Sequence, residues 1–203
     1  MANGALHAEI GAQVTAHYNT KSAPLDPLLQ EFGPERVRAI QADLSQETAV
    51  QRLFASTSAE PFGPVQVAVV NHAYYEARNV PVAQMSLDQW ESTFKANLTS
   101  SFLVVREYLR ELEQAADVVK EKAAIILIGS TAGKMGEAGH MDYSATKSGE
   151  CGESVCEWAV LTPASTAMMY GMCLSLKNEI VKIAPKGRVN VVAPGEHVLE
   201  SRA

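Results

Sequence analysis

A tyrosine and a lysine four residues apart, Tyr143 and Lys147, are the pair in this sequence best suited to proton transfer. On a helix, this spacing places a phenol and an ammonium one turn apart on the same face. A free tyrosine has a pKa of about 10 and is a poor base at neutral pH, but a nearby cation favours the phenolate. The tyrosine then becomes usable as a proton donor and acceptor. Alone the spacing is a weak signal, because it occurs by chance on many helices.

Two neutral polar residues extend this pattern. Ser130 follows the apolar run 124–128 and is suited to hydrogen-bonding a substrate carbonyl or hydroxyl. Asn97 lies in a long helical pattern and supplies a further polar group. Together with Tyr143 and Lys147, they make a strong candidate for a catalytic site.

The elements that position these side chains are indicated by the sequence pattern. The chain alternates short β-branched runs with helical patterns. Strands are expected over 13–18, 36–42, 65–70, 124–128 and 189–192, and helices over 23–32 and from Ser45, Ser86 and Tyr143. Such alternation indicates repeated βαβ units and a parallel sheet covered on both faces. In the helix from Ser86, four large apolar residues recur at spacings of four, which we interpret as core or as a subunit contact. They are Trp90, Phe94, Leu98 and Phe102.

Open parallel sheets bind ligands at the carboxyl ends of their strands. Here each expected strand is followed by small or polar residues, which allow a ligand to approach the backbone. They are Asn19, Thr20, Lys21 and Ser22; Asp43 and Leu44; Asn71, His72 and Ala73; Gly129 and Ser130; and Ala193, Pro194 and Gly195. This pattern favours a nucleotide-type cofactor; the alternative is a set of ordinary βα turns. His72 and His140 are interpreted as one turn residue and one exposed residue; the alternative is that they line the site.

Composition excludes several classes of protein. The 203 residues, 47% hydrophobic and 20% charged, suit one globular domain, and a net charge of −6 offers no basic face for nucleic acid. Three cysteines do not make a disulfide framework, which favours a cytoplasmic protein. The sequence has neither the roughly 18-residue apolar run of a membrane helix nor a signal-peptide pattern. Cys151 and Cys156 have no partner ligands, so no metal is expected.

Five motifs, in order, resemble those of the short-chain dehydrogenase/reductase family, in the subgroup of 3-oxoacyl reductases. They are N-H-A-Y from Asn71, N-L-T-S from Asn97, G-S-T-A-G-K-M-G from Gly129, Y-S-A-T-K from Tyr143 and G-R-V-N-V-V-A-P-G from Gly187. The resemblance implies a Rossmann-type, doubly wound parallel sheet in three αβα layers. It implies hydride transfer between NAD(P)(H) and a carbonyl/alcohol pair of a small molecule, in a homodimer or homotetramer.

The same resemblance assigns catalytic roles. Tyr143 is the expected general acid/base, and Lys147 is expected to lower its pKa and to bind the nicotinamide ribose. Ser130 is expected to orient the substrate oxygen, and Asn97 to hold a proton relay.

The resemblance also assigns contacts with the cofactor, NADP or NAD. Asp43 and Leu44 are expected against adenine, Asn71 and Ala73 on the adenosine side, and Pro194 and Gly195 near nicotinamide. The end of the first expected strand has no acid to accept a ribose 2′-hydroxyl, which favours NADP. The phosphate contacts there are Asn19, Lys21 and Ser22; a merely solvated Lys21 is the alternative.

The sequence departs from the family in three places. It contains no T-G-x-x-x-G-I-G turn, so the phosphate-binding turn and the first, central strand are expected to be missing from an incomplete single domain, 1–203. The pattern also stops after Gly195. In the third place, residues 149–166 interrupt the family pattern. A retained intron explains this segment, because its codons can hold splice signals; a real loop is the alternative. The alternative to an enzyme is therefore an inactive fragment or interaction-only product.

Overall fold

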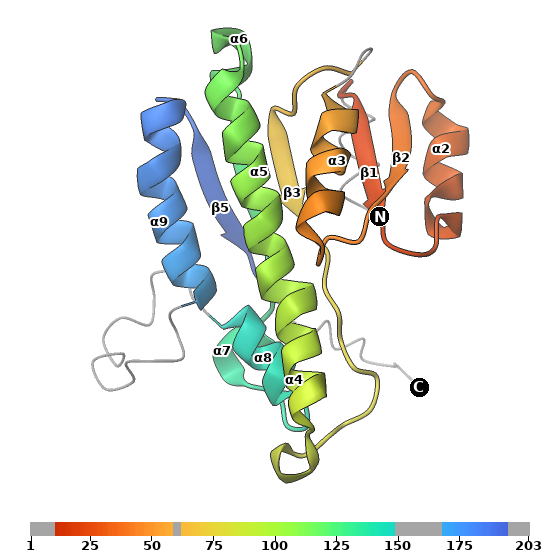
Figure 1. Ribbon diagram of the computed structural model, residues 1–203, viewed down its shortest axis with the longest axis vertical. Helices are drawn as coiled ribbons and strands as arrows, with labels where there is room; N and C mark the ends of the chain where they lie inside the picture. The colour runs from red at the N-terminus through yellow and green to blue at the C-terminus, as the bar shows by residue number, and fades with distance from the viewer. Residues whose placement is uncertain (1–10, 59–61, 149–167, 195–203) are drawn as a thin grey trace, which may run out of the picture.

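The structure, a computed structural model, describes residues 11–58, 62–148 and 168–194 (Figure 1). All five expected strands are present among them, with helices between. The elements are β1 (Val14–Tyr18), η1 (Ala23–Leu25), α2 (Asp26–Phe32), β2 (Val37–Gln41), α3 (Glu47–Thr57), β3 (Val67–Val70), η2 (Val82–Gln84), α4 (Leu87–Phe94), η3 (Lys95–Thr99), α5 (Ser100–Gln114), α6 (Asp117–Lys120), β4 (Ala124–Ile128), α7 (Ala132–Met135), α8 (Met141–Lys147), α9 (Met168–Ile183) and β5 (Arg188–Val192). The predicted insertion, 149–166, and Gly195 lie outside the described residues.

The strands pair only in parallel, as predicted, but they form two sheets. β1 pairs with β2, from Val14 opposite Val37 to Tyr18 opposite Gln41. The second sheet has the order β3-β4-β5, with β4 in the middle. Within the described residues, β1 and β3 are therefore edge strands, and no ladder joins the two sheets.

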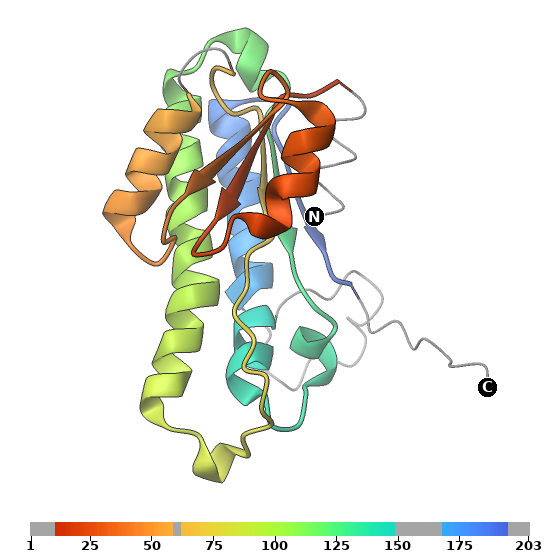
Figure 2. The ribbon, with the colours of Figure 1, turned by 90° about the vertical axis from the view of Figure 1, so that its right-hand side faces the viewer.

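Helices flank these sheets in a Rossmann-type α/β arrangement. Figures 1 and 2 show α3, α5 and α9 on one side and α2 beside β1 and β2 on the other. One hydrophobic core joins α3, α5 and α9 to β3, β4 and β5, with Tyr108, Ile125 and Ile180 at most 1% exposed. At two outer positions the sheet is open, since Val67 is 39% and Val192 49% exposed.

The long helical pattern from Ser86 forms two α-helices joined by a π-helical turn, η3. The Ser86 side chain caps α4 by accepting a hydrogen bond from the Gln89 N–H. The four apolar residues at spacings of four from Trp90 to Phe102 are not all part of the core, because Phe102 is 49% exposed. A subunit contact stays a prediction. The expected start of α3 at Ser45 is wrong by one residue, since Gln46 is its N-cap.

Across the part of the chain that the structure describes, none of the helices combines the length and apolar character needed to cross a membrane.

Candidate functional site

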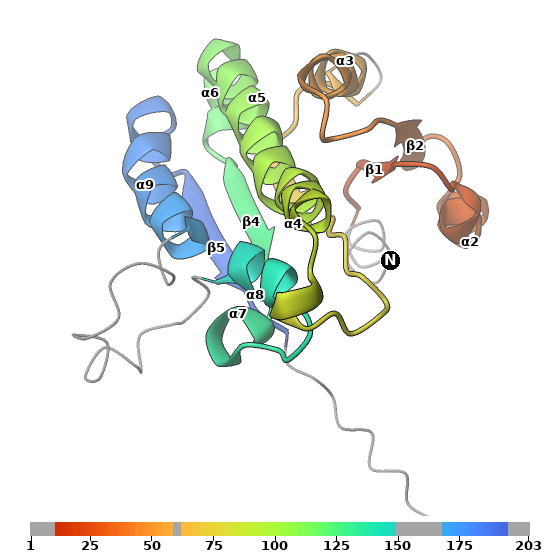
Figure 3. The same ribbon diagram turned by 60° about the horizontal axis from the view of Figure 1, so that its bottom comes forward.

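The carboxyl ends of β3, β4 and β5 point toward one end of the molecule, where α4, α7 and α8 gather (Figure 1). Figure 3 shows α7 and α8 side by side at this end. The tyrosine and lysine selected from the sequence lie on α8, and the selected serine, Ser130, lies in the loop between β4 and α7. The fold thus places the predicted catalytic residues at the ligand-binding edge of an α/β sheet.

Lys147 ties the end of α8 to the end of β4. Its Nζ donates a hydrogen bond to the Ile128 carbonyl oxygen at 2.6 Å, and the side chain is only 5% exposed. Ser130 follows Ile128 by two residues, and its Oγ accepts a hydrogen bond from the Ala132 N–H at 3.2 Å. Tyr143 lies one turn before Lys147 on α8. The Ser130 loop and the Tyr143–Lys147 helix therefore meet at the carboxyl end of β4.

Gly133 allows this close approach of α7 to α8. A Cβ at this position would overlap the Lys147 carbonyl oxygen and lie 2.7 Å from the Ser148 backbone nitrogen. Both neighbours are backbone atoms and cannot rotate away. The second glycine of the G-S-T-A-G-K-M-G motif is therefore a packing residue.

The Gly133→Ala substitution is expected to destabilise the protein by about 3 kcal/mol, because overpacking against backbone forces α7 and α8 apart. Urea unfolding followed by circular dichroism measures this loss. The matched control is Gly171→Ala on α9, where nothing lies within 4 Å of the added Cβ. That change is expected to be neutral or to stabilise by up to about 1 kcal/mol. Equal stability of the two variants would contradict the packing role.

Asn97 is buried, 4% exposed, inside the π-helical turn η3. Its Oδ1 accepts the Tyr74 N–H at 2.5 Å, and its Nδ2 donates to the Tyr74 carbonyl at 2.9 Å and to Thr146 Oγ1 at 3.1 Å. Asn97 thus holds the loop after β3 and the helix that bears Tyr143 against η3. The predicted proton relay through this residue stays a prediction.

Asp142, beside Tyr143, is a buried carboxylate that the sequence analysis missed. It is 1% exposed and accepts hydrogen bonds from Thr93 Oγ1 at 2.7 Å and Gln89 Nε2 at 3.1 Å. Burial raises the pKa of Asp142, but hydrogen bonds from the Thr93 and Gln89 side chains and from the backbone of Asp142 and Tyr143 together hold the pKa below its ordinary value. This carboxylate fixes α8 to α4. No local signal marks it, because its partners lie on another helix.

Tyr75 was also missed, and its ring contacts both His140 and Tyr143. The Tyr75 ring stacks on His140 at 4.3 Å between centroids and meets the Tyr143 ring edge-on at 5.0 Å. The Tyr75 hydroxyl donates to Glu137 Oε1 at 2.5 Å. The interpretation of one of the two histidines as exposed is wrong: His140 is 2% exposed with its Nε2 2.7 Å from Asn79 Oδ1, and His72 is partly buried.

The expected cofactor contacts separate into exposed and buried residues. Exposed at the strand ends are Asn19, Lys21, Ser22, Asn71, Ala73 and Pro194. Leu44 is instead 7% exposed and belongs to the core. Asp43 Oδ1 accepts the Ser45 N–H at 3.0 Å, and the hydrogen bonds from Ser45 lower the Asp43 pKa. No group of three or more His, Cys, Asp or Glu side chains within residues 11–58, 62–148 and 168–194 is placed to hold a metal ion.

His72 lies partly buried at the end of β3, with its Nε2 2.6 Å from Ser100 Oγ. Burial lowers the pKa of His72 to about 4, and the nearby His17 and Lys147 add to this effect. An unfolded chain has a histidine pKa of about 6.5. Between these two values, acid protonates His72 in the unfolded chain but not in the folded one. The free energy of unfolding therefore falls as the pH drops from 6.5 toward 4.

Replacing His72 by Asn is expected to remove part of this acid sensitivity. Between pH 7.5 and pH 5 the parent protein should lose about 2 kcal/mol more than His72→Asn, the amount that linkage assigns to a pKa of about 4. Urea unfolding at the two pH values measures the difference. The ionisable residue is removed while a polar side chain remains, so parallel losses in both proteins would show that His72 is not the group responsible.

Parallel strands, flanking helices and polar strand ends define this molecule as a Rossmann-type α/β protein with a ligand edge at α7 and α8. Residues 5–154 match the family model described as short chain dehydrogenase, and the chain belongs to this family. The chain is 30% identical over 149 residues to a 3-oxoacyl-[acyl-carrier-protein] reductase of Synechocystis sp., covering 71% of this chain and 56% of that protein. It is 24% identical over 155 residues to an Arabidopsis thaliana protein named NADPH-dependent aldehyde reductase-like protein, chloroplastic, covering 70% and 56%.

A solved structure from Brucella melitensis, titled short-chain dehydrogenase/reductase SDR:glucose/ribitol dehydrogenase, matches the fold with a TM-score of 0.69. It is 25% identical, and the match covers 95% of this chain and 69% of that one. This chain spans about half the length of the curated relatives it matches.

Proposed function

We propose that the protein is an NADP(H)-dependent oxidoreductase that interconverts a carbonyl and an alcohol. The observation that carries the proposal is the hydrogen bond from Lys147 to the end of β4, which brings the Tyr143 helix to the Ser130 loop. This arrangement supports a site in which a phenol, an ammonium and a hydroxyl act together at one strand end. They are the groups needed to orient a carbonyl and to deliver a proton to its oxygen.

Four residues of this chain have separate roles in the proposed reaction. Ser130 hydrogen-bonds the substrate oxygen, and Tyr143 transfers the proton to and from it. Lys147 favours the phenolate and binds the nicotinamide ribose, while Asn97 holds the loop and helix in register and carries the proton relay. NADPH supplies the hydride, and the chain's task is to bring the reacting centres together.

Exposed groups at the carboxyl ends of the strands fit the cofactor in part. Asn19 at the end of β1 and Asn71 at the end of β3 are exposed. Lys21 and Ser22, also exposed, would hold a 2′-phosphate, since a cation and a hydroxyl suit that group. Asp43 and Leu44 would lie against adenine, Ala73 on the adenosine side, and Pro194 and Gly195 near nicotinamide. The name of the Synechocystis reductase supports a carbonyl substrate, and the name of the Arabidopsis protein supports a carbonyl substrate and NADPH.

The proposal extends to a cytoplasmic enzyme that acts as a homodimer or homotetramer on a small-molecule substrate. The partly exposed aromatic residues of α4 and α5 support pairing between subunits. Trp90 and Phe94 stack at 4.4 Å between ring centroids, and Phe102 is 49% exposed.

Titration of the purified protein with NADPH, followed by fluorescence, tests the first requirement. Saturable binding that is weaker for NADH supports an NADP(H)-binding protein. Oxidation of NADPH in the presence of acetoacetyl-coenzyme A, a 3-oxoacyl thioester probe, then tests the reaction. An absence of binding at millimolar NADPH would contradict the proposal.

The alternative is a catalytically inactive fragment or interaction-only product, and two observations favour it. The sequence holds no T-G-x-x-x-G-I-G turn, and the described strands form two sheets that no described strand joins.

For residues 149–166, comparison of messenger RNA with the gene decides between a retained intron and a loop. A message that always keeps these codons contradicts the intron.

A further inference from the structure

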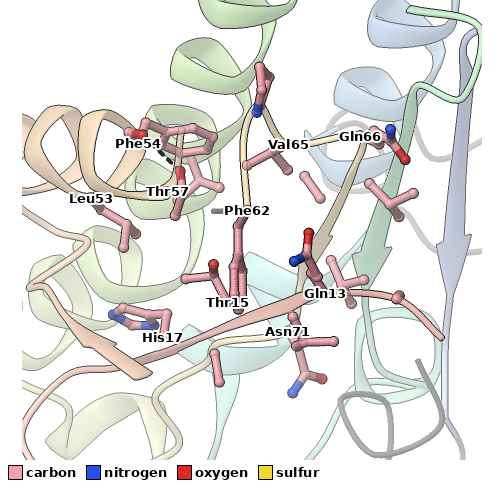
Figure 4. A pocket seen from close by; sticks show the side chains of 18 of the residues that line it. Gln13, Thr15, His17, Leu53, Phe54, Thr57, Phe62, Val65, Gln66 and Asn71 are labelled. Carbon is pink, nitrogen blue, oxygen red and sulfur yellow. Dashed lines mark hydrogen bonds between the residues drawn. The ribbon is translucent and has the colours of Figure 1, made fainter. Parts of the chain in front are cut away.

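The contact between α8 and the helical segment α4–η3 is built from polar side chains, unlike the packing of the hydrophobic core. Leu53, Phe54 and Val65 are an example of that apolar packing, and Figure 4 shows them beside a cavity that β1 and β3 line. Hereafter the contact is the polar seam; it consists of Gln89, Thr93 and Asn97 on α4 and η3, and Asp142 and Thr146 on α8. All but Gln89 are at most 4% exposed. Buried, directional hydrogen bonds therefore join these helices.

The polar seam brings together two stripes of residues spaced by four, one on each helical segment (Figures 1 and 3). Residues four apart on a helix lie on the same face, one turn apart. Asp142 Oδ2 accepts hydrogen bonds from Thr93 Oγ1 at 2.7 Å and from Gln89 Nε2 at 3.1 Å. One turn further along, Asn97 Nδ2 donates to Thr146 Oγ1 at 3.1 Å. The seam therefore holds α8 at two points that are one turn apart.

Helix α8 needs contacts with other elements to fix its direction. It has seven residues, and its N-cap, His140, makes no side-chain capping hydrogen bond. Helices shorter than about 12 residues are marginal on their own in water. On the α7 side, Gly133 lies against the Lys147 backbone, and Ser144 Oγ accepts the Glu137 N–H at 3.1 Å. The polar seam is the contact on the opposite side, toward α4 and η3.

Each α8 residue of the polar seam directly precedes a residue of the proposed catalytic pair. Tyr143 follows Asp142, and Lys147 follows Thr146. Successive residues of an α-helix are separated by about 100° around its axis. Hydrogen bonds that fix Asp142 and Thr146 against α4 and η3 thus also fix the direction in which Tyr143 and Lys147 leave the helix.

We propose that Asp142 is a positioning residue, through which the polar seam holds the Tyr143 ring in the direction that the reaction needs. A carboxylate suits this role, because one of its oxygens can accept donors from two turns of α4 at once. Apolar residues of similar volume often stabilise a helix contact as well as a buried charge does, whereas hydrogen bonds also define its geometry. The proposal rests on the proposed function, since the direction of Tyr143 matters only if its phenol transfers a proton.

The Thr93→Val variant tests the proposal from the neighbouring helix. It removes a donor to Asp142, keeps the shape of the side chain and leaves α8 unchanged in sequence. The reporter is the edge-on contact of the Tyr143 and Tyr75 rings, 5.0 Å between centroids, seen as a nuclear Overhauser cross-peak between their ring protons. Thr93→Val is expected to lose most of this cross-peak. Its turnover of NADPH with acetoacetyl-coenzyme A is expected to fall about tenfold, with the KM for NADPH within about twofold, because misplacement affects the chemical step more than binding.

Three further variants accompany Thr93→Val. Thr93→Ser keeps the hydroxyl and is expected to restore both the cross-peak and the turnover. Asp142→Ala removes the carboxylate itself and is expected to behave like Thr93→Val. Val105→Ala truncates a buried side chain of α5, which is 3% exposed, and controls for a general loss of stability. This core variant is expected to leave the cross-peak and the turnover unchanged.

Three results would overturn the proposal. One is a full cross-peak in both Thr93→Val and Asp142→Ala. Another is an equal loss in Val105→Ala, which assigns the effect to general destabilisation. The third is parental turnover in Thr93→Val despite a lost cross-peak, which shows that the reaction does not depend on this direction of the ring. The cross-peak is measured without cofactor or substrate, so a parent protein without turnover contradicts the proposed function, while the geometry of the polar seam is still decided.

Discussion

Replacing Tyr143 by phenylalanine is expected to lower the turnover of NADPH-dependent carbonyl reduction by about 10²–10⁴-fold, the usual contribution of a positioned acid/base group. The change removes one oxygen from α8 and leaves the ring beside Tyr75, so the edge-on contact at 5.0 Å between centroids persists. NADPH binding and folding are therefore expected to remain close to those of the parent. Steady-state oxidation of NADPH with acetoacetyl-coenzyme A measures the turnover, and fluorescence titration measures the binding.

The matched control is Tyr108→Phe, which removes a phenol far from the carboxyl ends of the strands. The Tyr108 hydroxyl donates to the Gln66 carbonyl oxygen at 2.7 Å, just before β3, and burial raises its pKa to about 12. Its loss is expected to cost about 1 kcal/mol of stability and to leave turnover unchanged. Full activity in Tyr143→Phe would overturn the assignment of the acid/base group, whatever the control does.

The second large effect is expected at Asn97. Asn97→Ala should reduce the free energy of unfolding by about 3 kcal/mol, because it removes three hydrogen bonds, two of them to the part-buried peptide groups of Tyr74. The amide makes hydrogen bonds of 2.5 and 2.9 Å to Tyr74 and one of 3.1 Å to Thr146, and water has little access to a side chain 4% exposed. Urea unfolding measures the loss.

Asn190→Ala on β5 controls for the loss of an amide as such, because Asn190 is exposed. Its cost is expected to stay within about 0.5 kcal/mol. A loss in Asn97→Ala no larger than in Asn190→Ala would show that the Tyr74 loop finds other partners. In that case Asn97 would not be what holds the loop to the Tyr143 helix.

The elements of this fold follow from short stretches of sequence. Alternation of short β-branched runs with helical patterns predicted all five strands, and Ser86 marked the start of α4. These signals are local, since a strand or a helix cap depends on residues within a few positions of each other. The site motifs were visible for the same reason: the four-residue spacing of Tyr143 and Lys147 lies on a single helix.

Local sequence patterns could not predict contacts between segments that are distant in the chain. Asp142 resembles any polar residue at a helix start, yet it is buried and accepts hydrogen bonds from Thr93 and Gln89 on another helix. No local pattern assigns a role to Gly133, and its packing role is apparent only where α7 meets the Lys147 carbonyl. No local pattern indicated that His140 is 2% exposed and stacks against the Tyr75 ring.

The sequence by itself determined the alternating elements, their parallel class and the candidate groups at the strand ends, because periodicity and turn chemistry act over neighbouring residues. The tertiary structure alone decided how the strands divide, with β1 and β2 in one sheet and β3, β4 and β5 in the other. It also decided that Lys147 reaches Ile128 and that Asn97 spans Tyr74 and Thr146. The physical reason is that ladders and buried hydrogen bonds join residues far apart in the chain, and their partners are selected by packing rather than by local pattern.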